Sequence, residues 1–223
     1  MGAAESIDNV LFDLDGTLVD SRGTITASIA HALERMGMAG DTEPPVSGLI
    51  GMPLFDIFTA VYGLARAPAL EAIEHYRRHY DRLSPAGTRI YDDVPQDLER
   101  LRACGLRLYV ATVKPTPIAK KVLADLALDV HFDGVAGASM GPERREKTAI
   151  IAHALTQFGL DPARSVMVGD RDQDISGART NGLRAIGVTY GFGGEEEITT
   201  ARPDFVSARP GAIAGFVTGG GLR

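Results

Sequence analysis

The sequence lacks several features that mark common protein classes. Cysteine occurs once, at Cys104, so the 223-residue chain can form neither an internal disulfide nor a multi-cysteine metal site. No stretch approaches the roughly 20 apolar residues of a membrane-spanning helix. The N-terminal segment has no basic start followed by a long apolar run, which a signal peptide would have. These absences predict a cytoplasmic protein that does not bind a membrane.

Positive charge is also scarce. The net charge is −6 and no Lys/Arg-rich block occurs, which argues against binding of nucleic acid or an anionic membrane surface. There are only four lysines, all in the second half of the chain: Lys114, Lys120, Lys121 and Lys147. Because there is no broad basic surface, we expect any anionic ligand to be a small molecule in a local pocket. With few aromatics, no tryptophan and 44% hydrophobic residues, the composition is typical of a globular α/β protein.

Short apolar runs alternate with helical periodicity through most of the chain. The runs end at polar residues, as in "VLFDLD", which reaches Asp13, and they recur at 105–112, 132–138, 164–170 and 183–188. Between them, apolar residues at helical spacing predict helices at 94–104, 117–127, 143–158 and 173–181. This alternation predicts an α/β fold with a Rossmann-like, doubly wound parallel sheet.

The segment from 22 to 88 has a different pattern. Apolar residues recur there at helical spacing, and no strand-like run lies between them. We therefore expect an all-helical domain inserted after the first strand. The predicted core domain comprises 1–21 and 89–223, and the helical domain comprises 22–88.

Several carboxylates stand where the predicted strands end. Asp13 and Asp15 follow the first strand, Thr112 ends the second, and Asp170 ends the strand at 164–170. In an open parallel sheet these ends form the ligand crevice, so the side chains should meet there. Clustered carboxylates repel unless a cation neutralises them, and oxygen ligands suit Mg²⁺. Asp174 lies one helical turn after Asp170 and can face the same site.

Phosphoryl transfer requires positive charge beyond a metal ion, to stabilise the equatorial phosphoryl oxygens. Lys147, near a predicted helix start, is the first candidate for this role, and Lys114, just past the second strand, is the second. Arg144 and Arg145 are alternatives to Lys147 at the same position in the fold.

Four motifs occur in an order that resembles the haloacid dehalogenase-like hydrolase superfamily. They are "FDLDGTLVDS", "VATVKPT", Lys147 and "VMVGDRDQDISGARTNG". The resemblance extends over nearly the whole chain and fits the phosphoglycolate phosphatase-like branch, which has a helical cap. It implies that Asp13 is the nucleophile, which becomes an aspartyl phosphate, and that Asp15 is the general acid and base.

The same resemblance implies the remaining site residues. The Mg²⁺ ligands would be Asp13, the backbone carbonyl of Asp15, and Asp170, with Asp174 in support. Thr112 would hydrogen-bond the phosphoryl oxygens, and Lys147 would bridge the nucleophile and the phosphate. Further substrate contacts would come from Lys114 and, in the cap, from Gly51 in "LIGMPL" and Arg77 in "EHYRRHY".

The superfamily contains several chemistries, and two are disfavoured. Dehalogenases lack the acid/base aspartate that is present here as Asp15. The cap-lysine chemistry of phosphonate hydrolases is disfavoured more firmly, because 22–88 contains no lysine. We therefore expect an Mg²⁺-dependent phosphatase for a small phosphate monoester, acting as a monomer or homodimer. The alternatives are a sugar-phosphate mutase that uses the same aspartyl phosphate, a non-enzymatic receiver-like domain, and an inactive binding protein.

Overall fold

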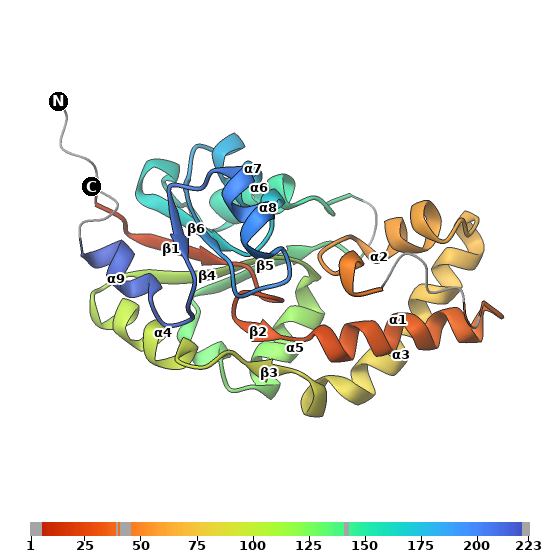
Figure 1. Ribbon diagram of the computed structural model, residues 1–223. Helices are drawn as coiled ribbons and strands as arrows, with labels where there is room; N and C mark the ends of the chain where they lie inside the picture. The colour runs from red at the N-terminus through yellow and green to blue at the C-terminus, as the bar shows by residue number, and fades with distance from the viewer. Residues whose placement is uncertain (1–5, 39, 41–45, 141–142, 220–223) are drawn as a thin grey trace. The chain divides into compact units, whose positions relative to one another are not determined.

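The computed structural model describes residues 6–38, 40, 46–140 and 143–219 (Figure 1). The pattern of contacts divides the chain into two compact units. One is a helical unit, 20–89, and the other is a core unit formed by the described residues of 1–19 and 90–223. The chain passes from one unit to the other at two short paired strands, β2 (Val19–Asp20) and β3 (Arg89–Ile90).

The core unit is built on a six-stranded sheet with the order β5-β4-β1-β6-β7-β8. All its neighbouring strands are parallel. The strands are β1 (Asn9–Phe12), β4 (Arg107–Pro115), β5 (Gly134–Ala138), β6 (Ser165–Gly169), β7 (Arg184–Val188) and β8 (Phe205–Ser207). The central strand, β1, is buried along its whole length because it has strands on both edges and helices on both faces.

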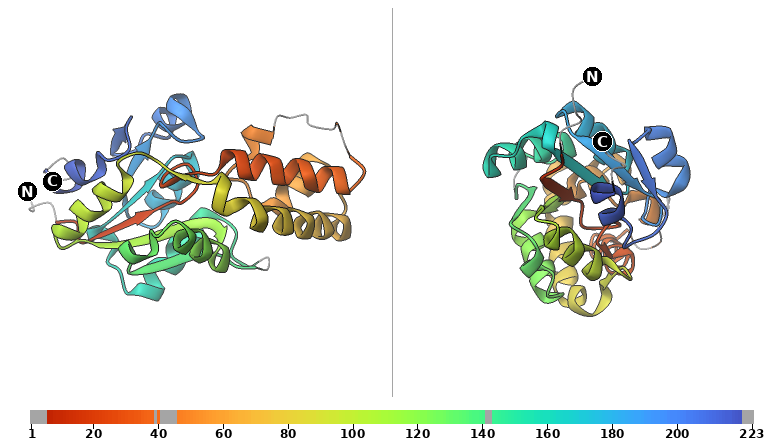
Figure 2. Two further views of the ribbon diagram at one scale, coloured as in Figure 1. Left: turned by 90° about the horizontal axis from the view of Figure 1, so that it is seen from below. Right: turned by 90° about the vertical axis from the view of Figure 1, so that its left-hand side faces the viewer.

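Helices cover both faces of this sheet. They are α4 (Val94–Ala103), α5 (Thr116–Asp125), α6 (Lys147–Phe158), α7 (Asp172–Thr180), α8 (Gly194–Ala201) and α9 (Ile213–Thr218). Figure 1 shows α6, α7 and α8 on one side of the sheet and α4 and α5 on the other, and Figure 2 gives two further views. This arrangement confirms the predicted doubly wound parallel sheet.

Alternate residues of the strands supply the core beneath α6 and α7. Leu11, Tyr109 and Met167 face this side and pack with Ile150 of α6 and Ile175 of α7. Each such aliphatic side chain contributes about 1.5–3 kcal/mol when fully buried. The short Val/Leu-rich runs of the sequence are therefore strands that must be covered on both faces.

The helical unit contains two long helices, α1 (Arg22–Arg35) and α3 (Arg66–Gly87), which pack against each other. Between them in the sequence lie a 3-10 turn (Val46–Leu49), α2 (Leu54–Asp56) and a π-helical segment (Ile57–Val61). Ile25, Ile29 and Leu33 of α1 and Ile73 and Tyr76 of α3 are buried. The apolar residues at helical spacing thus form the contact between the helices.

Several elements differ from the sequence-based expectation. β4 continues past Thr112 to Pro115, after a shift of register against β5. α6 begins at Lys147 rather than at residue 143, because the backbone N–H of Arg144 donates to Ser139 Oγ and its carbonyl accepts from the Ser139 N–H in a closed turn. The strand β8 and the helices α8 and α9 were not predicted. Among the described residues, no helix is long and apolar enough to cross a membrane.

Candidate active site

Three carboxylates converge at the carboxyl ends of two adjacent strands. β1 ends at Phe12, and the N–H of the next residue, Asp13, still donates to Val168 O of β6 at 2.9 Å. Asp170 directly follows β6, and Asp174 lies in the first turn of α7. One carboxylate oxygen from each of Asp13, Asp170 and Asp174 lies within 4.8 Å of the others. All three are buried, so we call them the carboxylate cluster.

Lys147 supplies positive charge to this cluster. It is the first residue of α6, and only 1% of it is exposed. Its Nζ lies 2.8 Å from Asp13 Oδ1 and 2.7 Å from Asp174 Oδ1, and it donates to Ala111 O at 3.0 Å. Burial lowers the pKa of Lys147, but the two carboxylates outweigh burial and raise the pKa above its usual value. The ammonium is therefore permanently charged at neutral pH.

One ammonium does not balance three carboxylates. Burial, followed by the charges of Asp13 and Asp174, raises the pKa of Asp170 from 3.8 to about 8. Burial also raises the pKa of Asp174 to about 6, although Lys147 opposes this shift. The cluster therefore has an excess of negative charge, which a bound cation would relieve.

Two buried oxygens of the cluster have incomplete hydrogen bonding. Asp13 Oδ1 and Asp174 Oδ1 accept no hydrogen bond from the residues that the structure describes, so each depends on its ion pair with Lys147. A single ammonium leaves part of the acceptor capacity of these two carboxylates unused. Carboxylate oxygens are the preferred ligands of hard divalent cations, so this donor set fits such an ion.

Asp170 is oriented by residues that the sequence analysis did not identify as site residues. Thr17 Oγ1 donates to its Oδ1 at 3.2 Å, and the Phe192 N–H donates to its Oδ2 at 2.7 Å. Thr17 is part of "FDLDGTLVDS", which carries the resemblance, whereas Phe192 lies in "GFGG" at 191–194, outside the four motifs. The first motif could have indicated Thr17 as a partner of Asp170, but no motif indicated Phe192.

Glycine is required where the backbone approaches Asp170 closely. Gly16 has φ +90°, and a Cβ there would lie 2.2 Å from Asp170 Oδ2. A Cβ on Gly191 would lie 2.4 Å from Asp170 Cβ. At Gly16 the positive φ and the close approach to Asp170 both exclude a side chain. The glycine of the first motif is therefore needed for the turn and for the position of Asp170.

Asp15 has a partner of its own. Both of its carboxylate oxygens accept from Lys114 Nζ, with 2.6 Å to Oδ1. Lys114 lies near the end of β4 and is largely buried. Thr112, two residues earlier in β4, is fully buried, and its Oγ1 accepts from the Lys114 N–H at 3.3 Å.

The structure thus gathers some of the predicted site residues and leaves others apart. It brings together the three aspartates of the carboxylate cluster, and Lys147 contacts two of them, Asp13 and Asp174. Arg144, an alternative to Lys147, directs its Nε to Gly137 O at 3.0 Å, and the ion pair with Asp13 comes from Lys147.

Gly51 and Arg77 belong to the helical unit. Gly51 has φ +98°, and Arg77 has a buried Nε that no described residue accepts from. Their contact with a substrate stays a prediction, as does metal binding by the backbone carbonyl of Asp15.

Comparison with known protein families supports the resemblance. Residues 10–188 match the family model described as haloacid dehalogenase-like hydrolase. A 5'-nucleotidase of Pseudomonas aeruginosa is 39% identical over 211 residues, covering 95% of this chain and 96% of that protein. A phosphoglycolate phosphatase of Yersinia pestis is 32% identical, covering 92% of this chain and 90% of that protein.

Another relative carries a different name, and a solved structure supports the fold. The tyrosine-protein kinase PtkA of Mycobacterium tuberculosis is 39% identical over 85% of this chain, but this chain spans only 64% of that protein. The crystal structure of a predicted phosphatase from Clostridium acetobutylicum has a TM-score of 0.85 and 33% identity, covering 91% of this chain and 94% of that one.

Proposed function

Because the chain belongs to the haloacid dehalogenase-like hydrolases, we propose that it hydrolyses a small phosphate monoester through an aspartyl phosphate on Asp13. Its place in the phosphoglycolate phosphatase-like branch makes it a phosphatase. The relatives differ in their named substrates, since one is a 5'-nucleotidase and another a phosphoglycolate phosphatase. We therefore propose a small phosphorylated metabolite, in the range from phosphoglycolate and sugar phosphates to nucleotides.

The observation that carries the proposal is the contact between Asp13 and Lys147 inside the carboxylate cluster. A carboxylate oxygen of Asp13 attacks phosphorus, and the bond from phosphorus to the ester oxygen breaks. The Lys147 ammonium, 2.8 Å from Asp13 Oδ1, orients the nucleophile and offsets the charge of the incoming phosphate. The product of this step is an aspartyl phosphate and an alcohol.

Asp15 is proposed to move the protons of the reaction. It gives a proton to the departing ester oxygen in the first step, and it takes one from the attacking water in the second. That water displaces Asp13 from phosphorus and releases inorganic phosphate. Lys114 holds both oxygens of Asp15 and thereby fixes its position, and Thr112 offers its hydroxyl to a phosphoryl oxygen.

The donor set fits a divalent metal, and we propose Mg²⁺. Asp13 and Asp170 would hold it with the backbone carbonyl of Asp15, and Asp174 would support them. The buried Oδ1 atoms of Asp13 and Asp174 and the raised pKa of Asp170 are the features of this chain that favour a bound cation. When bound, the ion supplies positive charge to the phosphoryl oxygens.

We propose that the helical unit acts as the cap that selects the substrate. The prediction placed Gly51 and Arg77 on its substrate side. The buried Nε of Arg77, which has no hydrogen-bond acceptor among the described residues, supports a role for this side chain in binding an anion.

A sugar-phosphate mutase is the nearest alternative, because it would use the same aspartyl phosphate. Incubation with glucose 1-phosphate separates the two: release of phosphate indicates a phosphatase, and isomerised sugar phosphate indicates a mutase. The receiver-like alternative predicts no catalytic turnover at all.

The direct test is phosphate release from an aryl phosphate such as p-nitrophenyl phosphate, with Mg²⁺ and with EDTA. We expect turnover that requires the metal and that Asp13→Asn abolishes. Asp8→Asn is the matched control, since Asp8 lies just before β1 and pairs with Arg164 instead of joining the cluster. Turnover that survives Asp13→Asn excludes Asp13 as the nucleophile. A screen of 5'-nucleotides, phosphoglycolate and sugar phosphates then identifies the substrate.

A further inference from the structure

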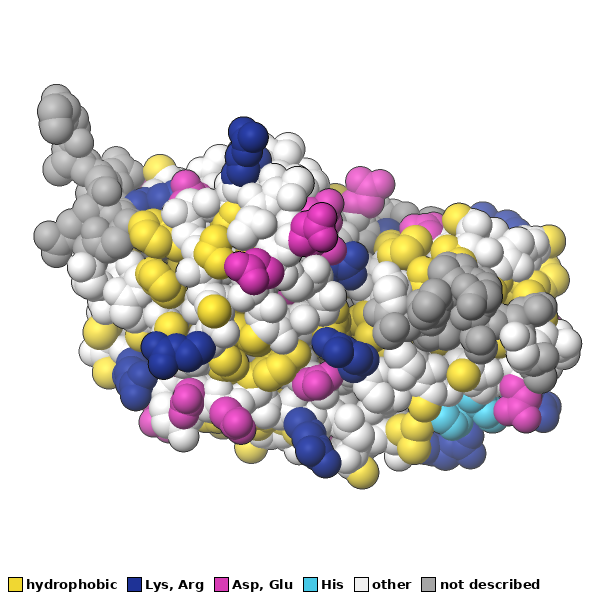
Figure 3. Space-filling view, viewed as in Figure 1, with side chains coloured by type: hydrophobic (Ala, Val, Ile, Leu, Met, Phe, Trp, Pro, Cys, Tyr) yellow, Lys and Arg dark blue, Asp and Glu magenta, His cyan; other side chains and the backbone are white. Residues whose placement is uncertain are grey.

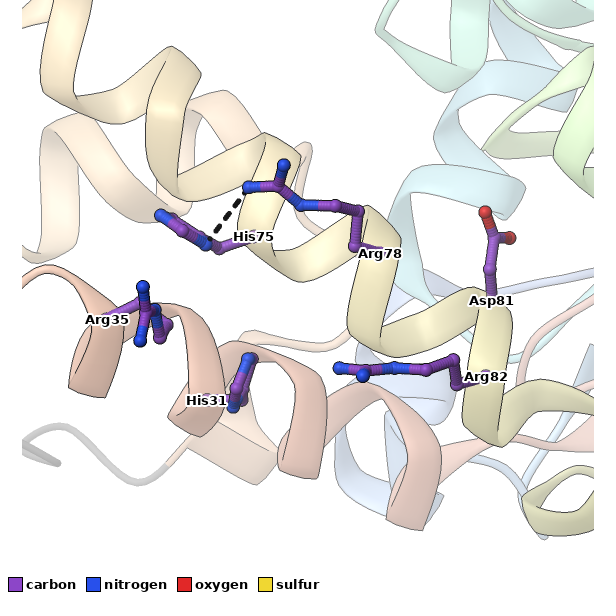
Figure 4. Close-up of a pocket in the computed structure, with 6 residues that line it drawn as sticks. All are labelled: His31, Arg35, His75, Arg78, Asp81 and Arg82. Atoms are coloured by element: carbon purple, nitrogen blue, oxygen red, sulfur yellow. Dashed lines mark hydrogen bonds between the residues drawn. The ribbon is translucent and has the colours of Figure 1, made fainter.

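The helical unit contains an open cavity of about 620 Å³ on the pair of long helices. Its lining comes from α1 and α3 alone: His31, Arg35, His75, Arg78, Asp81 and Arg82 (Figure 4). We call it the α1–α3 basic pocket. In Figure 3, histidine side chains lie beside Lys or Arg side chains on the surface of this unit.

The arginines of the pocket carry uncompensated positive charge. Arg35, Arg78 and Arg82 are exposed, and none forms an ion pair with a carboxylate in the part of the chain that the structure describes. Arg78 and Arg82 are four residues apart on α3, a spacing at which like charges repel. The one acidic lining residue is Asp81, and in Figure 4 its side chain points in a different direction from that of Arg82. With neutral histidines, the lining has a net charge of +2.

Arg78 is held in place by a histidine. Its guanidinium donates to His75 Nδ1 at 3.2 Å, so this nitrogen must carry a lone pair (Figure 4). The proton of the neutral ring is then on Nε2, which lies 3.8 Å from Glu71 Oε1. His75 therefore orients the guanidinium of Arg78, whose other N–H groups can still donate to a ligand.

A second histidine pair supports the pocket from α1. The rings of His31 and His79 are stacked, with centroids 4.2 Å apart. The Ser28 hydroxyl donates to Thr24 O at 2.7 Å, so it accepts from His79 Nδ1 at 3.1 Å. Burial, followed by His31 and Arg82, lowers the pKa of His79. The stack thus places two nearly parallel imidazole rings beside the arginines.

We propose that the α1–α3 basic pocket binds a small phosphate-bearing anion, as a second anion site in addition to the phosphoryl site of the core unit. Guanidinium groups form paired, planar hydrogen bonds with phosphate oxygens, and a dianion would match the net charge of the lining. The cavity volume lies within the range of sites for small molecules. The pocket shares no residue with the carboxylate cluster, so this inference stands or fails independently of the proposed function.

Histidine resonances provide a local measure of binding. Three of the five histidines, His31, His75 and His79, belong to the pocket and its supporting stack, whereas His131 and His153 lie in the core unit. The full chain, labelled with ¹⁵N-histidine, is titrated with inorganic phosphate and with pyrophosphate at constant pH and ionic strength. A parallel titration with chloride measures the effect of ions in general.

The expected result is a saturable shift of the pocket histidines with phosphate or pyrophosphate. Arg82→Gln and Arg35→Gln should each weaken binding about tenfold, or about 1.4 kcal/mol. The matched control is Arg66→Gln, because Arg66 is an exposed arginine of α3 that lies over the Phe55 ring and outside the pocket. Unchanged resonances of His131 and His153 establish that the core unit is folded, and an unchanged far-UV circular dichroism spectrum establishes that the variants keep the helices of the helical unit.

Three results would overturn the inference. The first is a shift of the pocket histidines that does not saturate with phosphate, and the second is an equal shift with chloride. The third is a phosphate titration whose midpoint is the same in Arg82→Gln and Arg66→Gln. Pyrophosphate binding tighter than phosphate binding would support a ligand with more than one phosphate group.

Discussion

The charge excess of the carboxylate cluster predicts an unusual pH dependence for the metal-free protein. Burial and the neighbouring carboxylates raise the pKa of Asp170 from 3.8 to about 8. Between these pH values the folded protein binds a proton that the unfolded chain releases. The free energy of unfolding in EDTA should therefore fall as the pH rises from about 4 to about 8.

The size of the effect follows from the same shift. At about 1.4 kcal/mol per pH unit, Asp170 alone costs the metal-free fold up to about 6 kcal/mol above pH 8. Asp174, whose pKa rises to about 6, acts in the same direction, although the coupling between the two prevents simple addition. Mg²⁺ bound by the folded state should restore this stability, and most strongly at high pH.

Asp170→Asn isolates the contribution of this carboxylate. The amide carries no charge and can keep one of the two hydrogen bonds from Thr17 and the Phe192 N–H, with a loss of about 1–3 kcal/mol for the other. In EDTA at pH 8 we expect a net gain of about 3 kcal/mol, which raises Tm by roughly 5–10 °C. At pH 5.5 the gain should disappear, and Mg²⁺ should stabilise the variant little at either pH.

Thermal unfolding in EDTA and in Mg²⁺, at pH 5.5 and pH 8, measures these differences. Asp97→Asn is the control, because Asp97 is a buried carboxylate that accepts from the Ile213 and Ala214 N–H groups, outside the cluster. It should lower stability but keep the Mg²⁺ increment. A metal-free wild type that is as stable at pH 8 as at pH 5.5 would refute the reasoning.

Three further substitutions test other parts of the site. Gly16→Ala forces a Cβ against Asp170 at a φ of +90° and should abolish the Mg²⁺ increment in Tm, whereas Gly23→Ala, at an open position, should not. Lys147→Met leaves buried carboxylates unpaired and should lower the free energy of unfolding by about 3–5 kcal/mol in EDTA, measured by urea titration at pH 8. Asp15→Asn should reduce kcat by about 10²–10⁴ for alkyl phosphates. With p-nitrophenyl phosphate, whose leaving group needs no proton, the first step should be nearly unchanged, measured as the pre-steady-state burst of p-nitrophenol, although the later hydrolysis of the aspartyl phosphate loses its base. A burst slowed as much as the turnover of alkyl phosphates would contradict a role of Asp15 as the acid.

The sequence predicted the sheet well, because every strand near the site is a short run that must be buried on both faces. It did not predict β8, since "FVS" is only three residues long and Val206 of this strand is 42% exposed. It placed the start of α6 too early, because Glu143 to Glu146 have helical composition. There the hydrogen bonds between Ser139 and Arg144 determine the backbone, and periodicity carries no information about them.

The close contacts of the site could be predicted only in part. The predicted strand ends correctly placed Asp13 and Asp170 at one edge of the sheet, and the helical spacing correctly placed Asp174 near them. The choice of Lys147 over Arg144 as the partner of Asp13 depends on where α6 begins, which directs Lys147 into the core and leaves Arg144 in the preceding turn. The hydrogen bond from Thr17 to Asp170 spans 153 residues, and the one from the Phe192 N–H spans 22, so no local pattern contains them.

The two aspartates of the first motif differ in their surroundings although they are only two residues apart. The pair of Asp13 and Lys147 is nearly sealed from water, with side chains 6% and 1% exposed. The pair of Asp15 and Lys114 is wetter, at 13% and 7%. A nucleophile benefits from the dry position, because its attacking oxygen has no shell of water to lose before it reaches phosphorus. A group that takes up and releases protons benefits from access to water. The Lys114 ammonium stabilises the ionised form of Asp15, so its proposed role as an acid requires the substrate to draw Lys114 away from at least one carboxylate oxygen.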